Sequence, residues 1–155
     1  MNEFLFGLSI GTWVLYIGTI WIMFGVQYSV SSSYYLLKKK KPLFTLVMWL
    51  TIIPLMLVSQ TLLTFIAGMG ICLVGVAPDY RLWKQELIAH LIGSYLGVLG
   101  AIATIWIDYH LWYVSVPLMV FIALAKFLNM KNHIWWIENV ALIATWIVIY
   151  FKIIV

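Results

Sequence analysis

The stretch GMGICLVGVAPDYRLWKQELIAHLIGSYLGVLGAIATIWID, residues 68–108, determines the predicted fold. An apolar run ends at Pro78, a polar loop follows, and a second apolar run begins near Glu86. If the second run is a helix, its small and polar residues share one stripe, at spacings of three and four: Glu86, His90, Gly93, Gly97, Ala101, Thr104 and Asp108. In lipid this stripe must face other helices, because a lipid-exposed carboxylate is strongly unfavourable.

The composition is that of a membrane protein. Of the 155 residues, 65% are hydrophobic and 9% are charged, and the mean hydropathy is +1.07. A soluble domain has about 45–50% apolar and about 25% charged residues. Only helices and closed barrels satisfy the backbone in lipid, and continuous rather than alternating apolar runs favour helices. We therefore predict an all-α polytopic membrane helix bundle that forms one domain, residues 1–155.

Charge and cysteine content exclude several other classes. The net charge of +4 comes mostly from Lys38, Lys39, Lys40 and Lys41, beside an apolar run, so it does not indicate nucleic-acid binding. The single cysteine, Cys72, excludes an intramolecular disulfide and argues against a cysteine metal site. The N-terminal apolar run exceeds a signal-peptide core of about 7–15 residues and no basic residue precedes it, which predicts a retained span.

The number of spans depends on residues 43–77, which are 35 residues without a charge. One span needs about 20 residues, so this segment is either one overlong helix or two short spans joined at Ser59–Thr61. Two spans place nearly all basic residues on one side, as the positive-inside rule favours. We therefore predict six transmembrane helices, with five as the alternative. The basic side is expected to be cytoplasmic and both termini non-cytoplasmic, in the inner membrane of a bacterium.

Small residues recur at helical spacing in several expected spans. They allow close approach of neighbouring backbones, as in small-xxx-small pairs. The glycines predicted to pack helices are Gly7, Gly11, Gly68, Gly75, Gly93 and Gly97.

The segment QYSVSSSYYLLKKKKP, residues 27–42, is typical of a membrane-surface loop. Tyr34 and Tyr35 suit the headgroup level, and Lys38, Lys39, Lys40 and Lys41 suit the cytoplasmic side. The simpler interpretation is a topology anchor. The alternative is a contact with anionic lipids, because clustered lysines at this position attract acidic headgroups.

A candidate polar cluster is expected near the basic side: Asp79, Glu86, His90, His133 and Glu138. These residue types can bind a metal or perform acid–base chemistry, and Glu86 and His90 are four residues apart. However, their spacing matches no established metal motif, and no catalytic nucleophile motif is present. A polar network with Arg81 or Lys84 is the favoured interpretation, with a ligand site and a metal site as alternatives. No cofactor is predicted.

Two segments resemble known membrane proteins. SSSYYL at residues 31–36, followed by LFTL at 43–46 and Pro54-Leu55, resembles a group of small uncharacterised bacterial and phage membrane proteins. GVAP at residues 75–78, followed by His90 and Gly93, is similar to six-span families that include the autophagy-modulator-like membrane proteins. The resemblance implies a six-span bundle in which Pro78 and His90 are the positions of interest, and it implies no catalytic activity.

Two functions follow from these patterns. The first is a non-enzymatic membrane protein that binds lipids, a protein partner or a second copy of itself. The second is a small membrane enzyme or transporter that uses Glu86, His90 and Glu138. A polar cavity that reaches His90 would favour the second function, whereas a packed interior with these groups paired would favour the first.

Overall fold

The computed structural model describes residues 1–77 and 79–154, with side chains through residue 152. Pro78, which the resemblance singles out, lies outside the described residues. The described chain is helical and without strands, which confirms the all-α prediction. Its six α-helices are α1 (Asn2–Phe24), α2 (Pro42–Ser59), α3 (Leu62–Val76), α4 (Lys84–Ala103), α5 (Trp112–Phe127) and α6 (His133–Ile149). The shorter elements are η1 (Ser31–Leu36), η2 (Lys38–Lys40), η3 (Thr104–Asp108) and η4 (Tyr150–Ile154).

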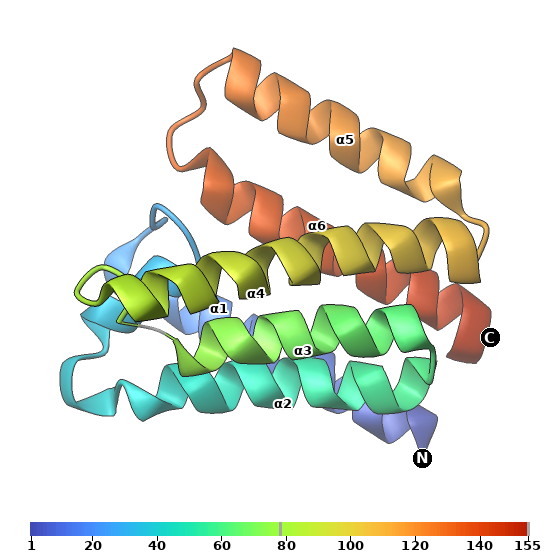
Figure 1. The fold of residues 1–155 in the computed structure, drawn as a ribbon, viewed down its shortest axis with the longest axis horizontal. Helices are drawn as coiled ribbons and strands as arrows, with labels where there is room; N and C mark the ends of the chain where they lie inside the picture. Colours follow the sequence, from blue (N-terminus) through green and yellow to red (C-terminus); the bar gives the residue numbers. More distant parts are fainter. Residues whose placement is uncertain (78, 155) are drawn as a thin grey trace.

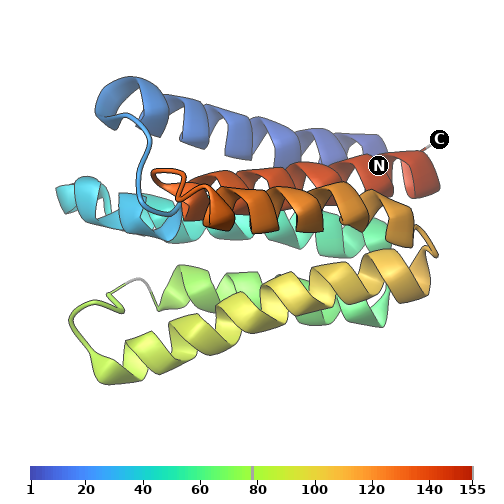
Figure 2. The ribbon, with the colours of Figure 1, turned by 90° about the horizontal axis from the view of Figure 1, so that it is seen from above.

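Successive α-helices run in opposite directions along one axis (Figure 1). Both termini lie at the same end of the bundle, together with the α2–α3 and α4–α5 turns. The other end carries the α1–α2, α3–α4 and α5–α6 loops. Seen from above, α3 and α4 form one layer, and α2 and α6 face them (Figure 2).

Four helices in the described chain are long and apolar enough to cross a membrane. They are Asn2–Phe24, Pro42–Ser59, Lys84–Asp108 and His133–Lys152. The other two, α3 and α5, are apolar but have only 15 and 16 residues. The described structure is therefore a helical bundle compatible with a membrane, and helix length supports four spans.

The uncharged segment 43–77 forms two helices rather than one overlong helix. The break lies at Gln60, which adopts a left-handed conformation with φ 54° and ψ 22°. Thr61 then caps α3, since its hydroxyl accepts a hydrogen bond from the Thr64 N–H at 3.2 Å. The polar turn predicted at Ser59–Thr61 is therefore confirmed.

Helices α3 and α4 approach most closely where glycines face each other. A Cβ added at Gly93 would lie 2.6 Å from the Gly70 carbonyl oxygen, and one added at Gly70 would lie 2.6 Å from the Gly93 carbonyl oxygen. Farther along, a Cβ at Gly100 would lie 2.9 Å from the Ala67 Cβ. No larger side chain fits here without moving a backbone.

The other predicted packing glycines have different surroundings. A Cβ at Gly97 would meet the Ile71 side chain of α3, whereas Gly68 and Gly75 face Met56 and Met48 of α2. In contrast, a Cβ at Gly7 or Gly11 would meet no atom within 4 Å. The close approach expected at these two positions is therefore not formed with any described residue of this chain.

Helices α1, α2 and α6 are joined by polar contacts in the core. The Ser9 hydroxyl donates to the Thr51 carbonyl at 2.7 Å, and the Trp146 indole donates to the Ser9 hydroxyl at 3.0 Å. The Trp13 indole donates to the Asn139 side-chain oxygen at 3.0 Å. Each of these three buried donors thus has an acceptor, as is usual for buried polar groups.

The first loop of the chain is fixed against α6. The Asn132 side chain donates to the Val26 carbonyl at 2.9 Å, and the Trp135 N–H donates to the Tyr28 carbonyl at 3.2 Å. The Val30 N–H donates to the Glu138 carboxyl group at 2.5 Å. These bonds position η1 and its tyrosines over the end of the bundle.

Candidate functional site

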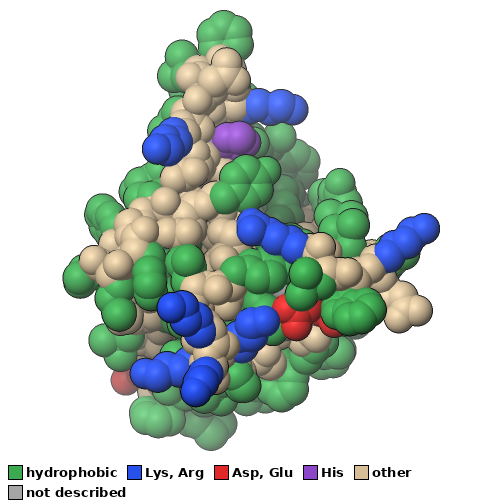
Figure 3. Space-filling model, turned by 90° about the vertical axis from the view of Figure 1, so that its left-hand side faces the viewer, with side chains coloured by type: hydrophobic (Ala, Val, Ile, Leu, Met, Phe, Trp, Pro, Cys, Tyr) green, Lys and Arg blue, Asp and Glu red, His purple; other side chains and the backbone are tan. Residues whose placement is uncertain are grey.

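One end of the bundle carries most of the positive charge (Figure 3). Of the nine basic residues, only Lys152 belongs to the end that carries the termini. We call the opposite end the basic end. It holds Lys38, Lys39, Lys40, Lys41, Arg81, Lys84, Lys126 and Lys131. The three described loops at this end bring together residues that are far apart in the sequence.

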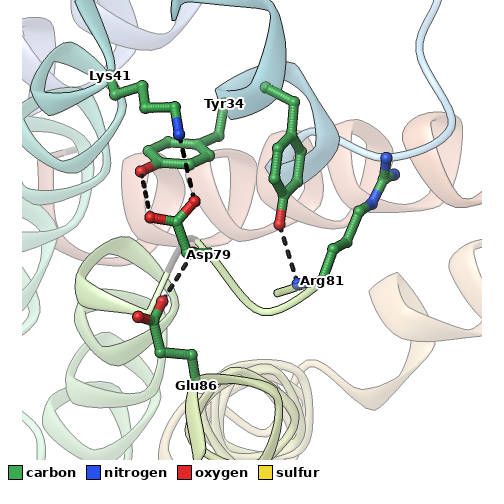
Figure 4. Close-up of polar contacts among 6 residues, drawn as sticks. Tyr34, Lys41, Asp79, Arg81 and Glu86 are labelled. Carbon is green, nitrogen blue, oxygen red and sulfur yellow. Dashed lines mark hydrogen bonds and ion pairs between the residues drawn. The ribbon is translucent and has the colours of Figure 1, made fainter. Parts of the chain in front are cut away.

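Asp79 lies at the centre of a polar network at the basic end (Figure 4). Its Oδ2 accepts a hydrogen bond from the Tyr34 hydroxyl at 2.9 Å. Its Oδ1 lies 3.3 Å from the Lys41 Nζ, which forms an ion pair. The Lys41 Nζ also lies 4.7 Å from the centre of the Tyr34 ring. Asp79 therefore joins the α1–α2 loop to the α3–α4 loop.

Two more contacts fix the α3–α4 loop. The Glu86 Oε2 accepts a hydrogen bond from the Asp79 N–H at 2.8 Å, so a first-turn residue of α4 binds the preceding loop. The Arg81 N–H donates to the Tyr35 hydroxyl at 3.0 Å. The Arg81 guanidinium lies 4.7 Å from the centre of the Tyr35 ring, within cation–π distance.

His90 is buried against the same loop, with 7% of its surface exposed. Its Nδ1 lies 3.2 Å from the Ala77 carbonyl oxygen. Its ring stacks on Tyr80, with ring centres 4.1 Å apart and planes at 25°. His90 therefore holds the end of α3 and the following loop against α4, which is a structural role.

A row of aromatic rings connects this histidine to the core of the bundle. Tyr80 meets Tyr35 edge to face at 5.8 Å, and Tyr35 meets Tyr34 at 5.3 Å. Tyr34 meets Phe44 of α2 at 5.9 Å. Edge-to-face contacts at these distances are favourable, so the row adds rigidity to the loops.

The surroundings of the two loop tyrosines favour their neutral forms. Burial raises the pKa of Tyr34, and its hydrogen bond to the Asp79 carboxylate raises that pKa further. Burial also raises the pKa of Tyr35. Both hydroxyls therefore keep their protons, and Tyr34 can act as a donor to Asp79 at neutral pH.

The five residues of the predicted polar cluster do not form one site. Asp79 and Glu86 are in contact, and His90 contacts Ala77 and Tyr80 in the same part of the chain. His133 instead contacts the Met130 carbonyl on the α5–α6 loop, and Glu138 contacts Val30. Within the described residues, no three His, Cys, Asp or Glu side chains could hold a metal ion together.

Sequence reasoning missed two parts of the network. It treated Lys41 as a topology anchor and expected Arg81 or Lys84 to be the basic partner in the network. In the described structure, the basic residue that pairs with Asp79 is Lys41. It also missed Tyr80, which stacks on His90. The sequence did contain a clue to the network. Asp79, Tyr80 and Arg81 follow one another in one loop, and each can form a hydrogen bond, a ring contact or an ion pair with another part of the chain.

The remaining lysines of the first loop face outward. Lys38, Lys39 and Lys40 are exposed, and the one ion pair in the described chain uses Lys41. The interior also contains a cavity of about 170 Å³, and His90, Asp79 and Glu86 do not line it. The basic end therefore combines an internally paired network with three unpaired surface cations.

Comparisons with known proteins add no further constraint. No family model, no curated protein and no solved structure matches the chain. The resemblance drawn from residues 31–55 and 75–93 therefore stays a prediction, and functional inference depends on the geometry alone.

Proposed function

We propose that this protein is a non-enzymatic, six-span membrane protein whose basic end faces the cytoplasm and binds anionic lipid headgroups. The observation that carries the proposal is the contrast among the clustered lysines. Lys41 is paired with Asp79, whereas Lys38, Lys39 and Lys40 are exposed beside it. A row of unpaired lysines at a membrane surface attracts acidic headgroups by about 1 kcal/mol per residue.

The six-span arrangement is supported by the packing of the short helices. Helix α3 lies against α2 and α4, both of which are long enough to span, and it runs antiparallel to each. Its 15 residues extend about 22 Å. Helices of this length fit a bilayer when the polar residues at their ends reach the headgroups. An even number of spans also keeps both termini on one side, as the bundle has them.

The proposal of a non-enzymatic protein is supported by the contacts of Asp79, Glu86 and His90, each of which already has a partner within the protein. The Asp79 carboxylate binds Tyr34 and Lys41, Glu86 binds a backbone N–H, and His90 binds a backbone carbonyl. A general acid or base needs a reachable substrate position next to it. Among the described residues, none of these three lines the interior cavity or the surface pocket beside Tyr34 and Lys41, so their contacts are better explained as loop anchors.

Lipid binding can be tested by thermal unfolding in a non-ionic detergent. We expect phosphatidylglycerol to raise the melting temperature of the wild type more than phosphatidylcholine does, because ligands that bind the folded state stabilise it. The triple variant Lys38→Gln, Lys39→Gln, Lys40→Gln should lose this difference. These side chains are exposed and unpaired, so the variant should fold normally.

Two controls make the test specific. Lys152→Gln removes a cation from the opposite end and should respond to phosphatidylglycerol like the wild type. Raising the ionic strength should reduce the response of the wild type, because salt screens exposed charges. An equal response of the wild type and the triple variant would reject the three lysines as the lipid site.

A further inference from the structure

The interior cavity is elongated and lies between two layers of the bundle. Its volume is about 170 Å³. Helices α2 and α6 line one side, and α3 and α4 line the other (Figure 2). It extends from Ser31 near the basic end to Tyr109 near the opposite end. Most lining side chains are apolar, so its shape and chemistry suit a linear hydrocarbon chain.

Most polar side chains along the cavity already have partners. The Ser94 hydroxyl donates to the His90 carbonyl at 2.8 Å, and the Thr104 hydroxyl donates to the Gly100 carbonyl at 2.9 Å. The Thr64 hydroxyl is hydrogen-bonded at 2.7 Å to the Ser59 hydroxyl, which lies outside the cavity lining. These groups need nothing from a bound molecule.

Two groups differ from the others. The Thr51 Oγ1 lines the cavity and is fully buried, and it has no hydrogen-bond partner in the described structure. The Glu138 carboxyl group accepts one hydrogen bond, from the Val30 N–H, through Oε2. No basic side chain of the described chain lies within ion-pair distance of Glu138. A buried polar group without its full set of partners requires an explanation.

Of these two groups, Glu138 is the one that can carry a charge. It lies five residues after the start of α6, about 8 Å into the helix. A carboxyl group inside a membrane bundle is strongly unfavourable unless a cation or donors compensate it, and such groups usually mark a functional site. Trp13 and Phe44 also line the cavity, and aromatic faces attract organic cations.

We propose that the cavity binds a cationic amphiphile, an alkylammonium head with an apolar tail. The ammonium group lies at Glu138, and the tail extends along the α3–α4 side. A fatty acid would place a second carboxylate beside Glu138, which is repulsive. A neutral alcohol would leave the carboxylate without a counter-charge. A file of water is disfavoured, since each water needs two to four polar partners and the lining is mainly apolar.

This site is separate from the lysines proposed to bind lipid. The overall charge of the protein cannot explain binding of a cation at this site. The protein has a net charge of +4, so a cation is not attracted to it overall. Binding of an ammonium ion therefore requires a local negative group. Glu138 is the acidic side chain that lines the cavity.

The proposal can be tested by calorimetric titration of the purified protein in a non-ionic detergent, with decylammonium, decanol and decanoate as probes. We expect saturable binding of decylammonium and at least tenfold weaker binding of the other two. Glu138→Gln should weaken decylammonium binding at least tenfold. It should still fold, because the amide oxygen can accept the bond from the Val30 N–H. Glu3→Gln, which changes an exposed carboxyl group at the opposite end, is the matched control and should bind like the wild type.

A second variant tests the cavity without changing the charge. Ala141 lies three residues after Glu138 on α6 and lines the cavity, so Ala141→Phe should fill part of it. This variant keeps Glu138 and should also bind decylammonium at least tenfold more weakly. Equal binding of decanol and decylammonium to the wild type would overturn the proposal, and so would unchanged decylammonium binding by Glu138→Gln or Ala141→Phe. An unchanged lipid response of the triple lysine variant would reject the proposed lipid site but would leave this result unaffected, because the lysines lie at a different site.

Discussion

The Tyr34 hydroxyl donates a hydrogen bond to the Asp79 carboxylate at 2.9 Å, across 45 residues of sequence. The bond joins the first loop to the third, and Lys41 completes it from the other side of the carboxylate. Tyr34 is 6% exposed, so the bond is shielded from water on the tyrosine side. The stability of the basic end should therefore depend on this pair.

A double-mutant cycle measures that dependence. Tyr34→Phe and Asp79→Asn should each lower the melting temperature in detergent, and the double variant should lose less than the sum of the two. A hydrogen bond to a charged group contributes about 1.5–3 kcal/mol, and partial exposure of Asp79 reduces the expected coupling to about 1–2 kcal/mol. Tyr28→Phe changes an exposed tyrosine of the same loop and should have no effect. Additive losses would mean that the two residues act independently.

Alkaline pH should weaken the same pair. Burial raises the pKa of Tyr34 above its usual value of about 10, and the Asp79 carboxylate adds to the shift. A pKa that is raised on folding contributes stability that is complete below the unfolded value and is lost as the pH rises through the folded value. The stability advantage of the wild type over Tyr34→Phe should thus be constant up to about pH 10 and shrink above it. Thermal unfolding of both proteins across this range checks the expectation, which a constant difference would contradict.

The α3–α4 contact should tolerate no added carbon. Gly93→Ala places a Cβ on the Gly70 carbonyl and should be destabilising by about 1–3 kcal/mol, as overpacking usually is. Gly18→Ala is the matched control, because a Cβ there meets nothing within 4 Å. Alanine is the better helix former by up to about 1 kcal/mol, so this control should be neutral or stabilising. Similar melting temperatures for the two variants would disprove the close contact.

The proposed topology predicts opposite labelling of two loops. In a Cys72→Ser background, Gln60→Cys should react with a membrane-impermeant thiol reagent added to intact cells. Lys39→Cys should react only after permeabilisation. Both positions are exposed, so access depends on the side of the membrane. Labelling of both from the same side would mean that no span, or an even number of spans, separates them, and would contradict the six-span arrangement.

His90 should act as a packing residue. His90→Gln keeps a group that can bond to the Ala77 carbonyl but loses the ring stacked on Tyr80. We expect a loss of about 0.5–1.5 kcal/mol, the usual contribution of an aromatic pair. Elemental analysis of the purified protein provides the second measurement. Stoichiometric zinc or iron that disappears in His90→Gln would show a metal role instead.

The sequence was sufficient for the features that depend on local pattern. Continuous apolar runs predicted helices, and the only polar break in residues 43–77 marked the α2–α3 turn. The spacing of Glu86, His90 and Gly93 placed them on the face of α4 that meets α3 and its loop. Each of these inferences requires only helical periodicity and the behaviour of polar groups in lipid.

Features that depend on the paths of loops could not be predicted in this way. Lys41 pairs with Asp79 because η1 and η2 carry it over the end of α3, and nothing local to either residue indicates this. The facing pair Gly70 and Gly93 required the register between α3 and α4. Glu138 was predicted to share one polar cluster with Asp79 and His90, whereas it bonds to Val30 of the first loop and lines the cavity.

The bonds between residues 26–30 and α6 have a consequence for the order in which the protein is made. The two ends of the Val30–Glu138 bond are separated by 108 residues, so a growing chain makes the first loop long before α6 exists. The Val26 and Tyr28 carbonyls and the Val30 N–H must then be satisfied by water or headgroups, because buried backbone groups need partners. A helix that is made about a hundred residues later therefore gives the first loop its final shape.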